Sequence, residues 1–249
     1  MSTAAHGRRV DVTTILVYHR VQEDRGSRSV SPAELQAHLA LVERAGGAFV
    51  DPTDEWLTAT ARKQFLLTFD DGTCDHRRRV LDILDRHGVR ALFFVPTQKI
   101  GTANRLSSRD VVELHRAGHA VGVHGHTHDR WDWLNQSQLR SELAKSRSIL
   151  EDLVGATPRH TAPPGGFFNP TIQNVVKELN FQSLRTMHWD LASGEDAYAL
   201  RVLPMSRVAG ALFIRAALYG HGAGLIRAAY RAKAGIRQMQ THRQATGAA

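Results

Sequence analysis

Two acidic residues at the end of an apolar segment are the first candidates for chemistry in this sequence. The apolar segment 65–69 ends in Asp70 and Asp71, and Gly72 follows. Neighbouring side chains inside a strand point to opposite faces, so two adjacent carboxylates can share one site only where the strand ends and the chain turns. Asp-Gly is also a common turn sequence, and taken alone this segment is equally compatible with a simple turn.

A second candidate segment carries three histidines at alternate positions, His124, His126 and His128. His124 and His128 come together if the chain coils there, whereas His126 would then point elsewhere. A solvated polar loop is the alternative. Two imidazoles and one carboxylate leave open positions for water around a divalent metal, with zinc as the first choice and cobalt, nickel, manganese or iron as alternatives. We therefore predict a metal site of His124, His128 and one of the two adjacent carboxylates, Asp70 or Asp71.

The two segments together predict hydrolysis. A metal ion lowers the pKa of a water that it binds, and a carboxylate beside it can take the proton as that water attacks a carbonyl. Both segments follow predicted strands. Because the carboxyl ends of barrel strands lie on one face, we expect both segments to meet there.

Short apolar segments alternate with longer helical patterns, which is typical of βα units that form a parallel sheet. The pattern predicts an α/β fold with a single (β/α) barrel, incomplete or distorted, and a doubly wound open sheet is the alternative. We expect strands at residues 14–18, 48–50, 65–69, 91–95, 119–123, 160–162 and 181–185. Capping and glycine signals predict helices at 31–45, 75–87, 108–117 and 135–154.

Composition limits the class of protein. A chain of 249 residues with 42% hydrophobic residues fits one barrel domain, which we place at residues 1–204. The net charge is +8, and residues 201–243 contain arginines and lysine but no acidic residue. We interpret residues 205–249 as a basic helical extension. Cys74 is the only cysteine, so no intrachain disulfide can form, and the sequence shows no apolar signal segment. These features predict a cytoplasmic protein.

The motifs carry a resemblance to a known family. Over roughly residues 15–204 the chain resembles the polysaccharide deacetylase family, also called the NodB-homology or carbohydrate esterase family 4 group. Segment 68–72, Thr-Phe-Asp-Asp-Gly, is similar to the first family motif, and segment 124–128, His-Gly-His-Thr-His, is similar to the second. The resemblance implies that Asp70 is the general base. It also implies metal ligation by Asp71, His124 and His128.

Some family positions differ in this chain. Gly125 stands where the second motif usually has Ser or Thr, and segment 162–169 lacks the arginine and tyrosine of the third motif. The backbone N–H of Gly165 could still serve as an oxyanion donor. Arg185, at the end of a predicted strand, is our candidate for the missing arginine, and Arg159 is the competitor.

The general acid has no clear counterpart. The last family motif is a Leu-x-His near the C-terminus, which this chain lacks. His188 is the nearest candidate, and His19 on the first predicted strand is the next. Either could instead be a structural histidine held by hydrogen bonds.

We therefore expect a metal-dependent de-N-acetylase that acts on an N-acetylated amino sugar or oligosaccharide, a polysaccharide precursor or a lipid-linked sugar. Hydrolysis of another amide or imide bond and a catalytically degenerate carbohydrate-binding protein are the alternatives. The basic C-terminal helices suggest peripheral contact with the anionic inner face of a membrane, although a solvated helical face or an oligomer contact would explain them too. We do not expect nucleic acid as a partner.

Overall fold

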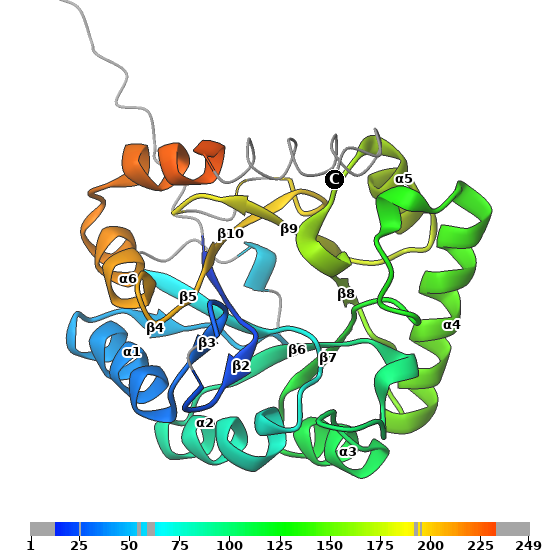
Figure 1. Cartoon of the computed structure of the whole chain (residues 1–249), viewed down its shortest axis with the longest axis horizontal. Helices are drawn as coiled ribbons and strands as arrows, with labels where there is room; N and C mark the ends of the chain where they lie inside the picture. Colours follow the sequence, from blue (N-terminus) through cyan, green and yellow to red (C-terminus); the bar gives the residue numbers. More distant parts are fainter. Residues whose placement is uncertain are drawn as a thin grey trace, which may run out of the picture.

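Among the residues that the structure describes, seven parallel strands close into a barrel (Figure 1). This computed structural model describes residues 13–24, 26–53, 56–58, 63–191, 194 and 196–232. Around the barrel the strands are β1 (Thr14–Tyr18), β10 (Leu200–Pro204), β9 (Ser183–Trp189), β8 (His160–Thr161), β7 (Ala120–Val123), β6 (Ala91–Val95) and β5 (Gln64–Phe69). The barrel closes because β5 also pairs with β1, from Thr14 opposite Phe65 to Tyr18 opposite Phe69.

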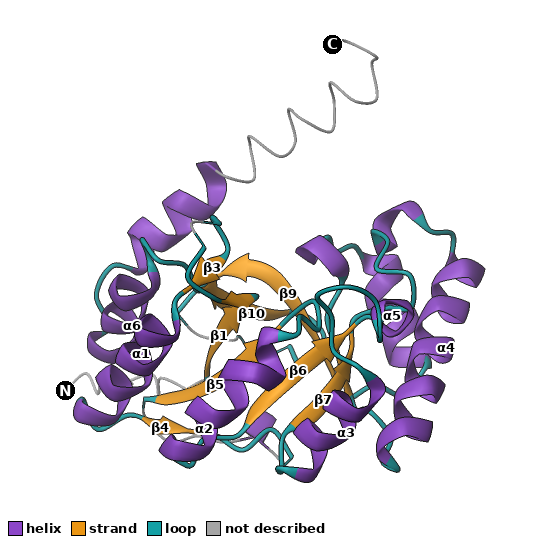
Figure 2. Cartoon of the chain, turned by 60° about the horizontal axis from the view of Figure 1, so that its bottom comes forward, coloured by secondary structure: helices purple, strands orange, loops and turns teal. Residues whose placement is uncertain are grey.

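Helices pack around the outside of this barrel (Figure 2). The α-helices are α1 (Pro32–Arg44), α2 (Leu81–His87), α3 (Ser108–Arg116), α4 (Gln136–Val154), α5 (Pro170–Glu178) and α6 (Gly210–Tyr219). A π-helical turn, η2 (His76–Val80), leads directly into α2. The 3₁₀ turns are η1 (Trp56–Thr58), η3 (Thr97–Lys99), η4 (Trp131–Trp133) and η5 (Pro164–Gly166). Helices α1, α3 and α4 each begin at a capping box, which confirms the start signals at Ser31 and Asn135.

The strand side chains alternate between the barrel interior and the layer beneath the helices. In β1, Ile15 and Val17 pack with Leu66 of β5 in one cluster, whereas Leu16 and Tyr18 belong to the large core shared with the helices. The interior is therefore a separate apolar layer. This two-residue period decides which polar side chains beyond the strand ends reach the inside of the barrel.

The expected barrel is confirmed, but its strands differ in part from the prediction. The segment 48–50 forms β4 (Ala48–Phe49), which pairs with β5 outside the closed ring. We missed β10, whose five residues close the ring between β9 and β1. Strand β9 begins later and runs further than the predicted 181–185. The weak strand at 160–162 is real but contributes only two residues, which makes this side of the barrel irregular.

The described part of the predicted C-terminal extension packs onto the barrel. Helix α6 lies against α1, and its Phe213, Ile214 and Leu218 are buried in the main core. Residues 223–232 are also helical and bury Ile226. The division at residue 204 stays a prediction, and residues 233–249, with Lys233, Arg237 and Arg243, lie outside the described residues. No helix in the described part of the chain is long and apolar enough to cross a membrane.

A small additional sheet stands beside the barrel. Strand β2 (Arg20–Val21) directly follows β1 and pairs with β3 (Ser29–Val30). The backbone N–H of Val21 donates to Asp75 Oδ2 at 2.6 Å, which ties this sheet to the segment after β5. The carboxyl ends of β1 and β5 are thus held close together.

Candidate active site

Polar side chains project into the barrel at the carboxyl ends of its strands. Asp70 follows β5 with the same two-residue phase as the interior residue Leu66, and His19 follows β1 with the phase of Val17. His124 follows β7. All three polar residues are at least nine-tenths buried, and all three line the same cavity. The strand period therefore delivers them to one place.

The predicted metal ligands are brought together. His128 Nε2 lies 3.0 Å and His124 Nε2 lies 3.4 Å from Asp71 Oδ1. The candidate ligand atoms of these three residues all lie within 4.8 Å of one another. Burial alone would raise the pKa of Asp71, but hydrogen bonds from the two histidines hold it well below its usual range. This donor set suits a divalent metal.

Backbone geometry and a second hydrogen bond aim these ligands. Asp71 and His128 have φ values of 72° and 74°, in the left-handed region that side chains rarely adopt. Such conformations are concentrated at functional sites. His124 Nδ1 donates to the Ala162 carbonyl oxygen at 2.8 Å, which leaves Nε2 free to face Asp71. Metal-binding histidines are commonly oriented by a bond of this kind.

A buried carboxylate on α4 supports the loop between the two histidines. Glu142 Oε1 accepts hydrogen bonds from the backbone N–H groups of His126 and Thr127 and from Thr127 Oγ1, each at 2.7 or 2.8 Å. Gly125 has a φ of 80°, and a Cβ there would stand 2.9 Å from Glu142 Oε1. The glycine that departs from the family pattern therefore leaves room for Glu142. Sequence reasoning missed Glu142, because nothing in its helix distinguishes it from a surface residue.

His126 is outside the cluster, as expected. Its Nδ1 lies 2.9 Å from Thr97 Oγ1, and among the described residues the ligand group at Asp71 includes His124 and His128 but not His126. The expectation that His124 and His128 come together without His126 is thereby confirmed.

Arg185 reaches Asp70 inside the barrel. Arg185 Nη2 donates to Asp70 Oδ2 at 2.6 Å, and the two side chains are only 2% and 4% exposed. The guanidinium also lies over the Phe94 ring, 5.0 Å from its centroid. We expected Arg185 at the end of its strand, but it lies within β9 and faces inward. The competitor Arg159 lies at the opposite end of the barrel. The catalytic role of Arg185 stays a prediction.

The two candidate acids occupy different places. His19 Nε2 lies 3.9 Å from Asp70 Oδ2. Burial lowers the pKa of His19 to about 4, although the charges of Asp70 and Asp71 oppose that shift. His188 has the opposite phase on β9 and packs edge-on against Phe168 and Tyr230, outside the cavity. The longer β9 thus turns His188 away from the cavity, and the identity of the general acid stays a prediction.

The cavity over these residues measures about 390 Å³. Gly165 and its neighbour Gly166 line it, and the role of the Gly165 N–H as an oxyanion donor stays a prediction. One wall comes from the C-terminal segment, through Met205, Phe213 and Ala229. The segment that we interpreted as an extension thus shapes the candidate active site.

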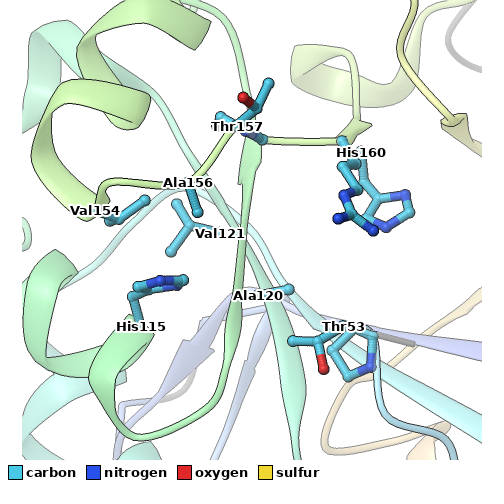
Figure 3. Close-up of a pocket in the computed structure, with 11 residues that line it drawn as sticks. Thr53, His115, Ala120, Val121, Val154, Ala156, Thr157 and His160 are labelled. Carbon is cyan, nitrogen blue, oxygen red and sulfur yellow. The ribbon is translucent and has the colours of Figure 1, made fainter.

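A second cavity of about 160 Å³ lies at the amino ends of the strands. Figure 3 shows His115 of α3, Val121 of β7 and His160 of β8 around it, and Arg159 also lines it. His160 is engaged with Ser183, its Nδ1 being 2.9 Å from the hydroxyl. Within the described residues, only Asp71, His124 and His128 form a group that could hold a metal. The chemistry is therefore concentrated at the carboxyl ends.

A closed α/β barrel with titratable groups at the carboxyl ends of its strands is the arrangement that barrel enzymes share. A family model described as polysaccharide deacetylase matches residues 58–184, a little over half of the 249 residues. The chain belongs to the polysaccharide deacetylase family.

Individual proteins agree with this assignment. A peptidoglycan-N-acetylglucosamine deacetylase of Bacillus cereus is 27% identical over 60% of this chain and 50% of its own length. A chitin deacetylase of Arthroderma benhamiae is 28% identical over 50% of this chain and 34% of its own length. The chain thus spans half or less of these two relatives.

Solved structures share the fold. The Streptococcus pyogenes deacetylase PplD in complex with acetate has a TM-score of 0.76 and 20% identity, over 83% of this chain and 98% of that one. IcaB from Ammonifex degensii has a TM-score of 0.75 and 22% identity, over 82% and 97%. At these identities the similarity shows the fold alone.

Proposed function

We propose that this protein is a metal-dependent hydrolase that removes the N-acetyl group from an amino sugar. The observation that carries the proposal is the cluster of Asp71, His124 and His128 beside the Asp70–Arg185 pair in one cavity. The names of the two relatives, which act on peptidoglycan and chitin, support this class of substrate.

Asp71, His124 and His128 would hold the metal through one carboxylate oxygen and two imidazole nitrogens. Zinc is our first choice, since this set leaves open positions for water and substrate. When bound, the metal supplies Lewis-acid polarisation of the acetyl carbonyl and a more acidic water.

Asp70 acts as the general base and takes a proton from the attacking water. Arg185 orients the Asp70 carboxylate, because its guanidinium holds Oδ2 and leaves Oδ1 without a partner among the described residues. The backbone N–H of Gly165 donates to the developing oxyanion. Each of these residues lies at the cavity or against a residue that lines it.

His19 donates the proton to the leaving amine in this proposal. It is the histidine beside Asp70 that is not assigned as a metal ligand. Burial lowers the pKa of His19 to about 4, so the neutral imidazole must first take up a proton. The proton that Asp70 removes from the attacking water can pass to His19, whose Nε2 lies 3.9 Å from Asp70 Oδ2, and from there to the leaving amine. The products are acetate and a free amino sugar.

The test is acetate release from mono-, oligo- and polyprenyl-linked N-acetyl sugars after metal reconstitution. We expect Asp70→Asn to abolish release while metal content persists. His19→Gln should lower kcat by about 100-fold or more, the range for a lost acid catalyst, and His188→Gln, the matched control, should not. A metal-loaded protein that releases no acetate from any of these sugars would refute the proposal and favour a degenerate binding protein.

We also propose peripheral membrane contact through the C-terminal segment. Val208, Leu212 and Leu225 are 93%, 65% and 77% exposed, and exposed Arg215 and Arg231 lie on the same segment. Exposed apolar and basic side chains together favour an anionic lipid surface. We expect binding to phosphatidylglycerol vesicles that weakens in L212Q/L225Q but not in the control W133Q. Equal binding by all three proteins would exclude this contact.

A further inference from the structure

A polar groove adjoins the catalytic cavity on the side of β2. The groove measures about 460 Å³ and shares Asp71 and Arg28 with the cavity that holds the metal-site residues. A substrate whose N-acetyl group reaches Asp71 therefore lies beside this groove. The residues that line the groove therefore influence which sugars can bind.

Three arginines from separate segments line this groove. Arg20 belongs to β2, Arg28 precedes β3, and Arg105 follows η3. Arg20 pairs with Asp24 at 3.2 Å on the exposed surface. Among the described residues, Arg28 and Arg105 have no carboxylate within ion-pair distance, and Arg105 Nη1 donates to the backbone carbonyl of Asp71. Two guanidinium groups thus line the groove without an ion-pair partner in the part of the chain that the structure describes.

Three arginines and two carboxylates line the groove, so the positive side chains outnumber the negative ones. Asp75 is buried, and its Oδ2 accepts the backbone N–H of Val21. Asp71 is assigned to the metal, whose positive charge would offset it. Burial is the main cause of the lowered pKa of His19 in the cavity, and the positive charge of Arg28 adds to that shift. The groove therefore favours a negatively charged occupant.

We propose that this groove binds an anionic group of the substrate, a phosphate or a carboxylate next to the N-acetylated ring, with Arg28 as its main contact. The guanidinium fork matches the geometry of both oxyanions. This inference rests on the proposed function and narrows its substrate class to charged amino sugars.

The experiment compares substrates that differ in charge. The neutral probe is methyl N-acetylglucosaminide, the phosphate probe is N-acetylglucosamine 1-phosphate, and the carboxylate probe is a disaccharide of N-acetylglucosamine and a uronic acid. We expect wild type to prefer one charged probe, and Arg28→Gln to lower kcat/KM on that probe by about tenfold, as for the loss of one charge-assisted hydrogen bond. Because Arg28 also lines the catalytic cavity, the rate of each protein on the neutral probe is its reference, and the tenfold loss is expected in the ratio of the charged-probe to the neutral-probe rate.

The control is Arg86→Gln, an exposed arginine near the end of α2 at the other end of the barrel. It should leave all three rates unchanged. Arg28 is itself exposed, so its replacement should not unfold the chain. The charged probe whose rate depends on Arg28 shows whether the groove binds a phosphate or a carboxylate. Equal rates on charged and neutral probes, or a preference that survives Arg28→Gln, would overturn the groove proposal and leave deacetylation intact.

Absence of acetate from every probe would count against the proposed function instead. The groove is then decided by calorimetry on the Asp70→Asn protein with N-acetylglucosamine 1-phosphate and with the uronate disaccharide. Binding of either that weakens about tenfold when Arg28→Gln is added supports the groove. Unchanged binding of both, or no binding of either, overturns it.

Discussion

Replacing Glu142 should loosen the metal site from a distance. Glu142→Ala removes the acceptor of three hydrogen bonds at the loop between His124 and His128. Each hydrogen bond to a charged group is worth about 1.5–3 kcal/mol. Because His126 and Thr127 are only half-buried, water can replace part of this, and we expect a total loss of about 2–4 kcal/mol in the free energy of unfolding. Metal affinity should fall about 10–100-fold, as for other residues that orient ligands.

Two measurements separate ligand positioning from simple stability. Urea unfolding of the metal-free protein gives the loss of stability, and competition with a chromophoric chelator gives the metal affinity. Glu142→Gln keeps one acceptor oxygen and should recover most of the affinity, and Glu151→Ala on the same helix is the control. A Glu142→Ala protein that is less stable but binds metal like wild type would refute the reasoning, because the carboxylate would then only attach α4 to the loop.

Three other perturbations have expected outcomes. Asp71→Ala should lower metal affinity more than about 100-fold, the upper end for outer-shell partners, and metal retained at wild-type levels after dialysis would contradict the assigned site. Burial lowers the pKa of His38 and His160 to about 4, so the unfolded chain binds more protons below about pH 6.5. The contribution of these two histidines to the free energy of unfolding is then fully present above that pH and is lost as the pH falls toward 4. The loss is about 2 kcal/mol per histidine near pH 5. Urea unfolding at a series of pH values measures this loss, and a free energy of unfolding that does not change between pH 7 and pH 5 would contradict the prediction. Gly122→Ala would place a Cβ 2.7 Å from the Phe94 ring and should cost about 1–3 kcal/mol by overpacking, which an unchanged melting temperature would disprove.

The barrel and the centre of the site were predictable from local patterns. Asp70 and Asp71 follow a strand and precede a glycine, and the four-residue spacing of His124 and His128 predicts that their side chains come together. Short-range rules were therefore sufficient to predict this part of the site. The position of β10 was not predictable, because Leu200–Pro204 is short and includes Arg201, and only pairing with β1 and β9 makes it a strand. His188 was misplaced for the same reason. Its orientation depends on where β9 ends, and strand ends are decided by neighbours.

Contacts between residues that lie far apart in the sequence were the hardest to predict. Glu142 supports the histidine loop from a helix whose exposed positions carry similar polar residues, so no local signal marks it. The wall of the cavity from the C-terminal segment was also hidden. A basic, alanine-rich composition suggests a solvated helix, yet Phe213 and Ile214 are buried on the barrel side.

The role that we propose for Arg185 would let a barrel preserve a site while its motifs change. A buried ion pair is a weak source of stability, because desolvation offsets much of the attraction. The presence of the Asp70–Arg185 pair inside an apolar barrel is therefore better explained by chemistry than by folding. The family places an arginine in its third motif, and segment 162–169 lacks one. Because every strand of a closed barrel delivers alternate side chains to the same interior, β9 can supply the guanidinium that a loop would otherwise provide.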